Sequence, residues 1–300
     1  MVWHAHDGRR FLLTTILLEG FSPVLMHRAS GLFAPVPFLL SVMIIAAGVL
    51  AIMLLVRGEC SLRCSRKAFL AVAGVAVCNM TAYALILVGT RTSSGVSTAL
   101  LMQSEMVWTL LLSWFFLHER VSLRRIMGIL TVLLGAITVL WRGVIVVHKG
   151  ELLIVCATML YPFGNTCAKH ALRELSPLHV LLLRYLLGIV YLLFLGFLVG
   201  QPGFIIPSVA EHWLVFLTFA LVIFVVSKIC WYEGLKRHDL HLSVATITAV
   251  PALAMVYAYI LLGEVPSLHQ WIGLAITVGG LYLLFRRGER GELPEEAITG

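Results

Sequence analysis

Long apolar runs separated by short polar loops fill most of this chain. A helix needs about 20 apolar residues to cross the hydrocarbon core of a bilayer, and runs of that length recur along the sequence. The pattern predicts an all-α integral membrane protein with ten transmembrane helices, followed by a polar tail over residues 287–300. The predicted spans are 11–29, 37–56, 68–90, 95–117, 123–141, 150–169, 178–199, 212–235, 242–262 and 268–285.

Composition supports this reading. Of the 300 residues, 60% are hydrophobic and only 12% are charged, whereas soluble domains carry about 25% charged residues. A water-soluble fold of this length has too little interior to hide so much apolar sequence, so lipid must solvate most of the surface. The net charge of +7 comes from loop clusters typical of cytoplasmic retention, and we expect no nucleic-acid partner.

The basic residues alternate between the two sides of the predicted membrane. With a cytoplasmic N-terminus, four of them face outward: Arg28, Arg91, Arg142 and Lys149. Sixteen face the cytoplasm: Arg9, Arg10, Arg57, Arg63, Arg66, Lys67, Arg120, Arg124, Arg125, Lys169, Arg173, Lys236, Arg237, Arg286, Arg287 and Arg290. This positive-inside bias predicts that both termini are cytoplasmic. The short termini and compact loops favour a bacterial inner (plasma) membrane, with a eukaryotic organelle membrane as the alternative.

The two halves of the chain repeat each other. A shift of 142 residues lays Phe21 on Phe163 and Pro35 on Pro177, and a shift of 145 lays Glu119 on Glu264. Each half holds five predicted helices, so the second half enters the membrane inverted relative to the first. Such inverted repeats place a substrate site between the halves near the midplane. The shift of 145 also pairs glycines that we expect to let helices pack closely: Gly128 with Gly273, and Gly135 with Gly280.

The matched segments resemble a known family. Ser97–Trp141, with His118-Glu119-Arg120-Val121-Ser122, is similar to the end of an EamA repeat, and so is Ser243–Phe285, with Gly263-Glu264-Val265-Pro266-Ser267. EamA repeats belong to the drug/metabolite transporter superfamily. The resemblance implies repeats over 11–141 and 150–286, ten helices and transport of small metabolites. The first half has Met106 where the second has Pro251, so we expect a straighter fourth helix.

Charged side chains inside the predicted spans are the strongest functional signal. A charge at a helix centre costs about 2.5–3.5 kcal/mol on insertion scales, so it usually faces a cavity or a partner. Helical spacing and repeat alignment add aromatic and amide neighbours to these charges. The candidate substrate-binding or proton-coupling residues are Glu19, Glu105, Arg184, Lys228, Tyr83, Tyr161, Asn165 and Trp108.

Each charge also has a structural interpretation. Glu19 and Glu105 are alternatively hydrogen-bonded interhelical carboxyls or ion-pair partners of the two buried bases, and Arg184 alternatively extends to the cytoplasmic interface. The repeat places Tyr161 on Glu19, Tyr83 on Lys228, and an apolar valine on Arg184. The scaffold is therefore symmetric and the charges are not, which favours a role in reading the substrate or a coupling proton.

The sequence favours a carrier over other classes. It lacks the HExxH and GxSxG patterns of common hydrolases, and Cys60 and Cys64 have no further ligands nearby; we expect no enzyme activity, metal or cofactor. The prediction is a secondary transporter that exports a small polar metabolite, an amino acid or similar, by alternating access. Proton coupling is a further hypothesis, because low dielectric favours a neutral carboxyl. The alternative is a flippase for a lipid-linked or amphipathic molecule. The expected partners are the substrate, the lipid bilayer and, at most, a second copy: a monomer or homodimer.

Overall fold

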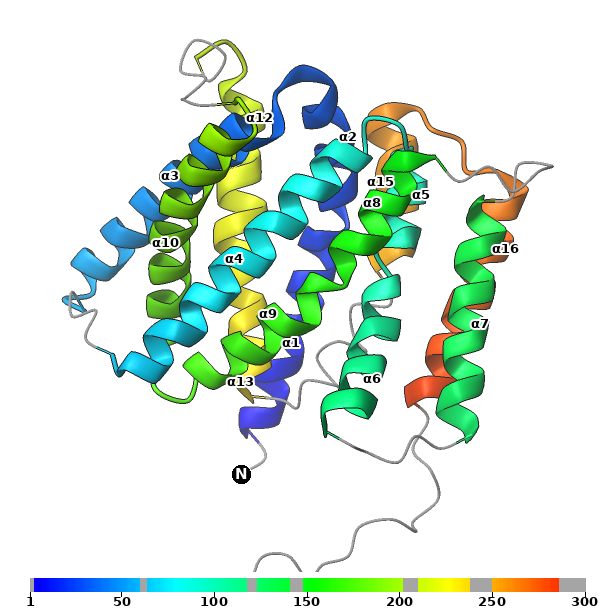
Figure 1. Cartoon of the computed structure of the whole chain (residues 1–300), viewed down its shortest axis with the longest axis horizontal. Coiled ribbons are helices and arrows are strands. Elements are labelled where there is room, and N and C mark those ends of the chain that lie inside the picture. The colour runs from blue at the N-terminus through cyan, green and yellow to red at the C-terminus, as the bar shows by residue number, and fades with distance from the viewer. Residues whose placement is uncertain are drawn as a thin grey trace, which may run out of the picture.

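The computed structural model describes residues 3–59, 64–117, 123–140, 148–201, 210–237 and 250–285, and every regular element in these ranges is a helix (Figure 1). Five of the described helical stretches are long and apolar enough to cross a membrane: Pro35–Val56, Arg66–Gly89, Lys149–Ala171, Pro177–Leu198 and Trp213–Arg237. Two shorter apolar stretches accompany them. The predicted tail, the 118–122 motif and residues 242–249 of the ninth span lie outside the described residues.

The described helices divide into two sets, one in each half of the chain. The first half contains α1 (Trp3–Glu19), α2 (Phe21–Leu32), α3 (Pro35–Val56), α4 (Arg66–Gly89), α5 (Gly95–Leu101), α6 (Ser104–Leu117) and α7 (Leu123–Leu140). The second half contains α8 (Lys149–Thr158), α9 (Leu160–Ala171), α10 (Pro177–Leu198), α12 (Trp213–Leu217), the π-helix η1 (Thr218–Ser227), α13 (Lys228–Arg237), α15 (Val250–Leu262) and α16 (Leu268–Phe285).

Several spans that the sequence predicts as single helices are broken near their middle. The first span divides at Gly20 into α1 and α2, and the sixth divides at Met159 into α8 and α9. A proline lies just beyond each break, at Pro23 and Pro162. Proline has no N–H to bond the carbonyl four residues earlier, and its ring crowds that carbonyl. By the shift of 142, Met159 corresponds to Leu17, so the two breaks lie within three residues of equivalent places in the repeats.

The expectation of a straighter fourth helix is wrong. This span divides between α5 and α6, where Gln103, Glu105 and Met106 donate their backbone N–H groups to carbonyls three residues back instead of four. The Ser104 hydroxyl also donates to the Leu101 carbonyl at 2.8 Å. Serine side chains compete with the helix ladder in this way, so the break forms without a proline.

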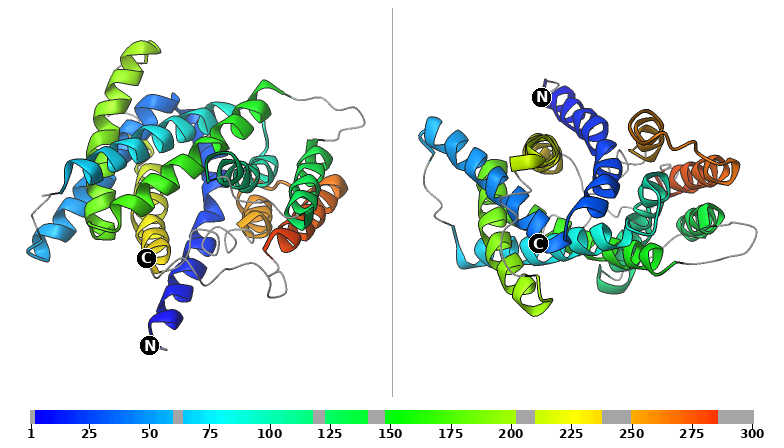
Figure 2. Two further views of the ribbon diagram at one scale, coloured as in Figure 1. Left: turned by 60° about the horizontal axis from the view of Figure 1, so that its bottom comes forward. Right: turned by 90° about the horizontal axis from the view of Figure 1, so that it is seen from above.

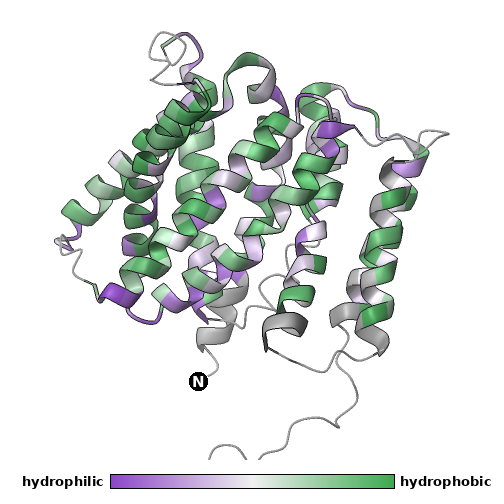
Figure 3. Ribbon diagram, viewed as in Figure 1, coloured by the Kyte–Doolittle hydropathy of each residue, from purple (hydrophilic) through white to green (hydrophobic). Residues whose placement is uncertain are grey.

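Apolar side chains cover the outside of the bundle as well as its core. Among the exposed large residues are Val56, Phe197 and Ile260, and Figure 3 shows apolar colour along the helices with polar colour gathered near their ends and in connections. The core includes Phe38, Phe216 and other rings packed between α3, α10 and η1. An apolar exterior matches a lipid environment.

The helices α7 and α16 form a close pair at one edge of the molecule (Figures 1 and 2). A Cβ added at Gly280 would lie 2.7 Å from the Val132 backbone nitrogen and 2.9 Å from the Gly128 carbonyl oxygen, and Gly135 faces Thr277 and the Gly273 carbonyl as closely. Glycine permits this backbone approach because it has no Cβ. The predicted role of these glycines in helix packing is confirmed.

Candidate functional site

A cavity with about 880 Å³ of empty space lies between the two halves of the chain. Residues of α1, α2, α4, α5 and α6 line it from the first half, and residues of α9, α10, α13 and α15 line it from the second. The chain departs from a regular α-helix at three places beside the cavity: at Gly20, at Met102–Gln103 and at the start of α13. Each of these places brings a polar side chain into the lining. Non-helical backbone at membrane depth is tolerated where it is buried or lines such a cavity.

Seven of the eight candidate residues line this cavity. They are Glu19, Tyr83, Glu105, Tyr161, Asn165, Arg184 and Lys228. The eighth, Trp108, is not part of the lining; its indole N–H donates to the Val155 carbonyl at 3.2 Å, which ties α6 to α8.

Glu19 and Lys228 form a buried ion pair across the repeats. The Lys228 Nζ lies 2.6 Å from the Glu19 Oε1, and the Ser227 hydroxyl donates to the same oxygen at 2.7 Å. Glu19 is the last residue of α1, and Lys228 is the first of α13, where the π-helix gives way to an α-helix. The ammonium also lies 5.9 Å from the centre of the Tyr83 ring, within cation–π distance.

Glu105 has an amide partner instead of a base. The Asn165 side-chain nitrogen donates to Glu105 Oε1 at 2.9 Å, linking α6 to α9. Among the described contacts, no Lys or Arg nitrogen lies within ion-pair distance of this carboxyl. The two carboxylates of the cavity are therefore held differently, one by a base and one by an amide.

Arg184 is buried and has no carboxylate at ion-pair distance among the described residues. Its side chain is 1% exposed, which rules out the alternative in which it extends to the interface. Nη1 donates to the Tyr232 hydroxyl at 3.0 Å, and the guanidinium lies 5.4 Å from the Tyr185 ring centre. Its Nε and Nη2 atoms have no hydrogen-bond partner in the described part of the chain.

Residues at equivalent positions of the two repeats line the cavity. A shift of 142 relates Glu19 to Tyr161 and Pro23 to Asn165, and a shift of 145 relates Tyr83 to Lys228 and Glu105 to Val250; all eight residues line the cavity. The equivalent of Arg184 is Val42, which is buried in the core instead. Related positions thus carry different chemistry on the two sides of one cavity.

Among the further lining residues, three polar ones were missed from the sequence: Thr15, Asn79 and Gln103. Each is a polar residue within a predicted apolar span, and that was a usable signal. It is weaker than a charge because an amide or hydroxyl inside a membrane often bonds within its own helix or to a neighbour.

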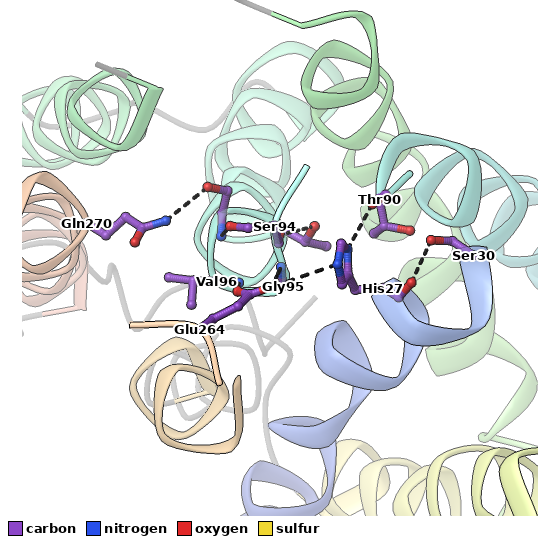
Figure 4. Close-up of polar contacts among 10 residues, drawn as sticks. His27, Ser30, Thr90, Ser94, Gly95, Val96, Glu264 and Gln270 are labelled. Carbon is purple, nitrogen blue, oxygen red and sulfur yellow. Dashed lines mark hydrogen bonds and ion pairs between the residues drawn. The ribbon is translucent and has the colours of Figure 1, made fainter. Parts of the chain in front are cut away.

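A separate polar network lies one helical turn from the cavity, at the N-terminus of α5 (Figure 4). Glu264, in the connection between α15 and α16, accepts hydrogen bonds from the Gly95 and Val96 backbone N–H groups at 3.2 and 3.3 Å. The same carboxylate lies 3.8 Å from His27 Nε2, while His27 Nδ1 lies 3.0 Å from the Thr90 carbonyl oxygen. The network joins a connection of the second repeat to three segments of the first.

The comparison with known proteins identifies relatives over the whole chain. The model of the EamA-like transporter family matches residues 8–141 and again residues 148–286. The uncharacterized transporter YetK of Bacillus subtilis (strain 168) is 24% identical over 205 residues, 66% of this chain and 62% of its own length. The uncharacterized transporter sll1164 of Synechocystis is 25% identical over 138 residues, 45% of this chain and 39% of its own length. The matches thus span less than two thirds of each of these relatives.

A solved crystal structure that the comparison found shares the fold. It superposes with a TM-score of 0.70 at 18% sequence identity, covering 94% of this chain and 97% of the other.

Proposed function

This chain belongs to the EamA-like transporter family, and we propose that it exports a small polar metabolite, an amino acid or a molecule of similar size, by alternating access. The observation that carries this proposal is the cavity between the repeats, which residues of both halves line at equivalent positions and which contains four charged side chains. Inverted-repeat carriers expose such a midplane site to one side of the membrane at a time.

The proposed topology has ten crossings with both termini in the cytoplasm of a bacterial cell. The two matches to the family model support five crossings per repeat. The broken segments α1–α2, α5–α6 and α8–α9 each supply one crossing, and α15 belongs to the ninth. The outward surface then holds the connection between α15 and α16, and the Lys and Arg bias supports that orientation.

In this topology, the Glu264 network closes the outer end of the cavity. Val96, which donates to Glu264, precedes the cavity-lining Ala99 by one turn of α5. Opening toward the outside requires α5 to separate from the α15–α16 connection, which breaks the contacts drawn in Figure 4. A carboxylate that accepts from two backbone donors at a helix N-terminus stabilises the closed arrangement.

Glu105 is the proposed site of proton coupling. Glu19 is neutralised by Lys228 at 2.6 Å, whereas Glu105 accepts a hydrogen bond from the Asn165 amide at 2.9 Å and has no Lys or Arg at ion-pair distance among the described residues. Gaining or losing a proton at Glu105 would change the charge of the cavity and its contact with α9 without breaking an ion pair. Carboxyls inside transport proteins often serve as such proton relays.

Export can be tested in cells that overproduce the wild-type protein or a cavity variant at matched membrane levels. Metabolites in the medium are quantified by mass spectrometry for wild type, Glu105→Gln, Lys228→Ala and the control Trp108→Phe, which lies outside the cavity. We expect a metabolite that wild type and Trp108→Phe expel and the two cavity variants do not. Equal export by all four proteins would refute the assignment of the cavity as the transport site.

A further inference from the structure

The guanidinium of Arg184 presents one complete edge that no described residue occupies. Nε and Nη2 form that edge, both are buried, and neither has a hydrogen-bond partner, while Nη1 on the other side bonds Tyr232. Buried donors are almost always satisfied, and a buried unpaired charge costs several kcal/mol. Arg184 lines the cavity, so a molecule bound there can satisfy this edge once a small movement of the buried side chain exposes it.

We propose that the transported substrate carries a carboxylate, which binds the Nε–Nη2 edge of Arg184 through two parallel hydrogen bonds. This inference rests on the proposed transport function. Two adjacent N–H donors in a rigid plane match the two oxygens of a carboxylate, a geometry that lysine cannot reproduce. The aromatic rings of Tyr185 and Tyr232, with centres 5.4 and 5.9 Å from the guanidinium carbon, hold that plane in place.

The charge of the cavity favours a single negative charge on the substrate. Lys228 is already paired with Glu19 at 2.6 Å, so its charge is compensated inside the protein. Arg184 is left as the one base among the described lining residues without a carboxylate at ion-pair distance. With Glu105 in its protonated form, a substrate carboxylate supplies the one charge that compensates Arg184. A phosphate ester carries roughly 1.5 to 2 negative charges at neutral pH and would bring uncompensated charge into the cavity.

The rest of the lining suits an amphipathic body attached to that carboxylate. Apolar lining residues include Met102, Met106 and Val250, and the Ser22 hydroxyl is buried there without a partner. These apolar side chains lie beside the polar ones in a single cavity. The substrate class is therefore a small organic carboxylate with a partly apolar body, which includes amino acids.

Binding can be measured on the purified full-length protein with matched probes. Benzoate and L-leucine are compared with benzamide, L-leucinamide and phenyl phosphate by the concentration dependence of the thermal unfolding midpoint. We expect each carboxylate to raise the unfolding midpoint of the wild-type protein at a concentration at least about tenfold lower than its amide requires for the same rise. The reason is that hydrogen bonds to a charged group are stronger than those to a neutral one. Arg184→Lys should weaken carboxylate binding by about tenfold, and Arg184→Gln should abolish it.

Labelling of wild-type protein gives a second readout that does not depend on folding of the variants. Phenylglyoxal can reach the buried Arg184 only when the cavity opens. Its modification, read by peptide mass spectrometry, should fall when the carboxylate is present, while labelling of the exposed Arg66 stays constant. The proposal is overturned if neither carboxylate stabilises or protects the protein, if an amide or phenyl phosphate acts equally, or if Arg184→Gln still binds the carboxylate.

The two proposals fail in different ways. An exported metabolite without a carboxylate would overturn the role of Arg184 and leave export intact. A carboxylate can instead protect Arg184 and yet not be exported in the cell-based assay. That result would support the binding site but count against its role in transport.

Discussion

At the residue scale, the two buried carboxylates of the cavity have different partners and so different expected roles. Glu19 shares its oxygen with Lys228 and Ser227, whereas Glu105 accepts from Asn165. Removing one member of a buried ion pair leaves the other charge uncompensated, which costs more than the pair itself contributes. Glu19 is therefore expected to govern stability, and Glu105 the coupling of transport to protons.

Lys228→Met should lower the free energy of unfolding by about 3 kcal/mol, because Glu19 is then left buried without its base. The double variant Glu19→Gln/Lys228→Met should regain most of that loss, since no unpaired charge remains. Thermal unfolding of the purified proteins measures both. Arg237→Gln, which breaks a more exposed pair with Glu233, is the control and should change stability by about 1 kcal/mol or less. A double variant as unstable as the single one would contradict this account.

Glu105→Gln should uncouple transport from protons. In proteoliposomes loaded with the exported metabolite, an imposed pH gradient should accelerate wild-type transport and leave the variant unaffected, while exchange of labelled for unlabelled substrate continues. Asn165 can still bond a glutamine oxygen, so the link between α6 and α9 is kept. If the variant responds to the gradient as wild type does, the coupling carboxyl is not Glu105.

At the element scale, apolar run length predicted most helices but not where they break. A run of apolar residues reports burial in lipid and says little about whether the backbone continues as one helix. Pro23 and Pro162 were visible signals of breaks; the break at Met102–Gln103 has no proline, and local bonds of Ser104 accompany it. The π-helix η1 is a continuous apolar run without glycine or proline, so composition could not reveal it.

The paired helices α7 and α16 give a sharp test of packing. Gly280→Ala places a Cβ 2.7 Å from the Val132 nitrogen, whereas at the adjacent Gly279 an added Cβ meets nothing within 4 Å. Gly280→Ala should destabilise the protein by about 1–3 kcal/mol, as overpacking does. Gly279→Ala should be neutral or slightly stabilising. The thermal unfolding midpoints of the two variants provide the comparison, and equal midpoints would refute the close contact.

At the scale of the whole molecule, the repeat explains why the sequence located the cavity but not its full chemistry. Two sequence signals, the charges inside apolar runs and the repeat shifts of 142 and 145, pointed to seven residues that line one cavity in the structure. Neither signal showed that Lys228 would form its ion pair with Glu19, because the pairing depends on how the inverted halves pack. The free edge of Arg184 likewise appears only when its neighbours are in place.

Glu264→Gln should shift the protein toward an outward-open state. The variant keeps an oxygen for one N–H of α5 but loses the charge that Gly95, Val96 and His27 face. A cysteine introduced at Ser22 in a cysteine-free background reports opening through its reaction with a membrane-impermeant maleimide added outside. We expect faster labelling with Glu264→Gln and no change with Val265→Ala, an exposed neighbour. Unchanged labelling in Glu264→Gln would show that this network does not hold the outer end closed.

The most direct test of the account is the access of Ser22→Cys from both sides of the membrane. Ser22 lines the cavity, and Ser41, which is also buried but lies in α3 outside the lining, is the matched control. Right-side-out and inverted vesicles are treated with the impermeant maleimide. If the cavity is an alternating-access site, the cysteine at position 22 reacts in both preparations and the cysteine at position 41 in neither. Reaction of position 22 from one side only, or from neither, would contradict the claim that substrate crosses the membrane through this cavity.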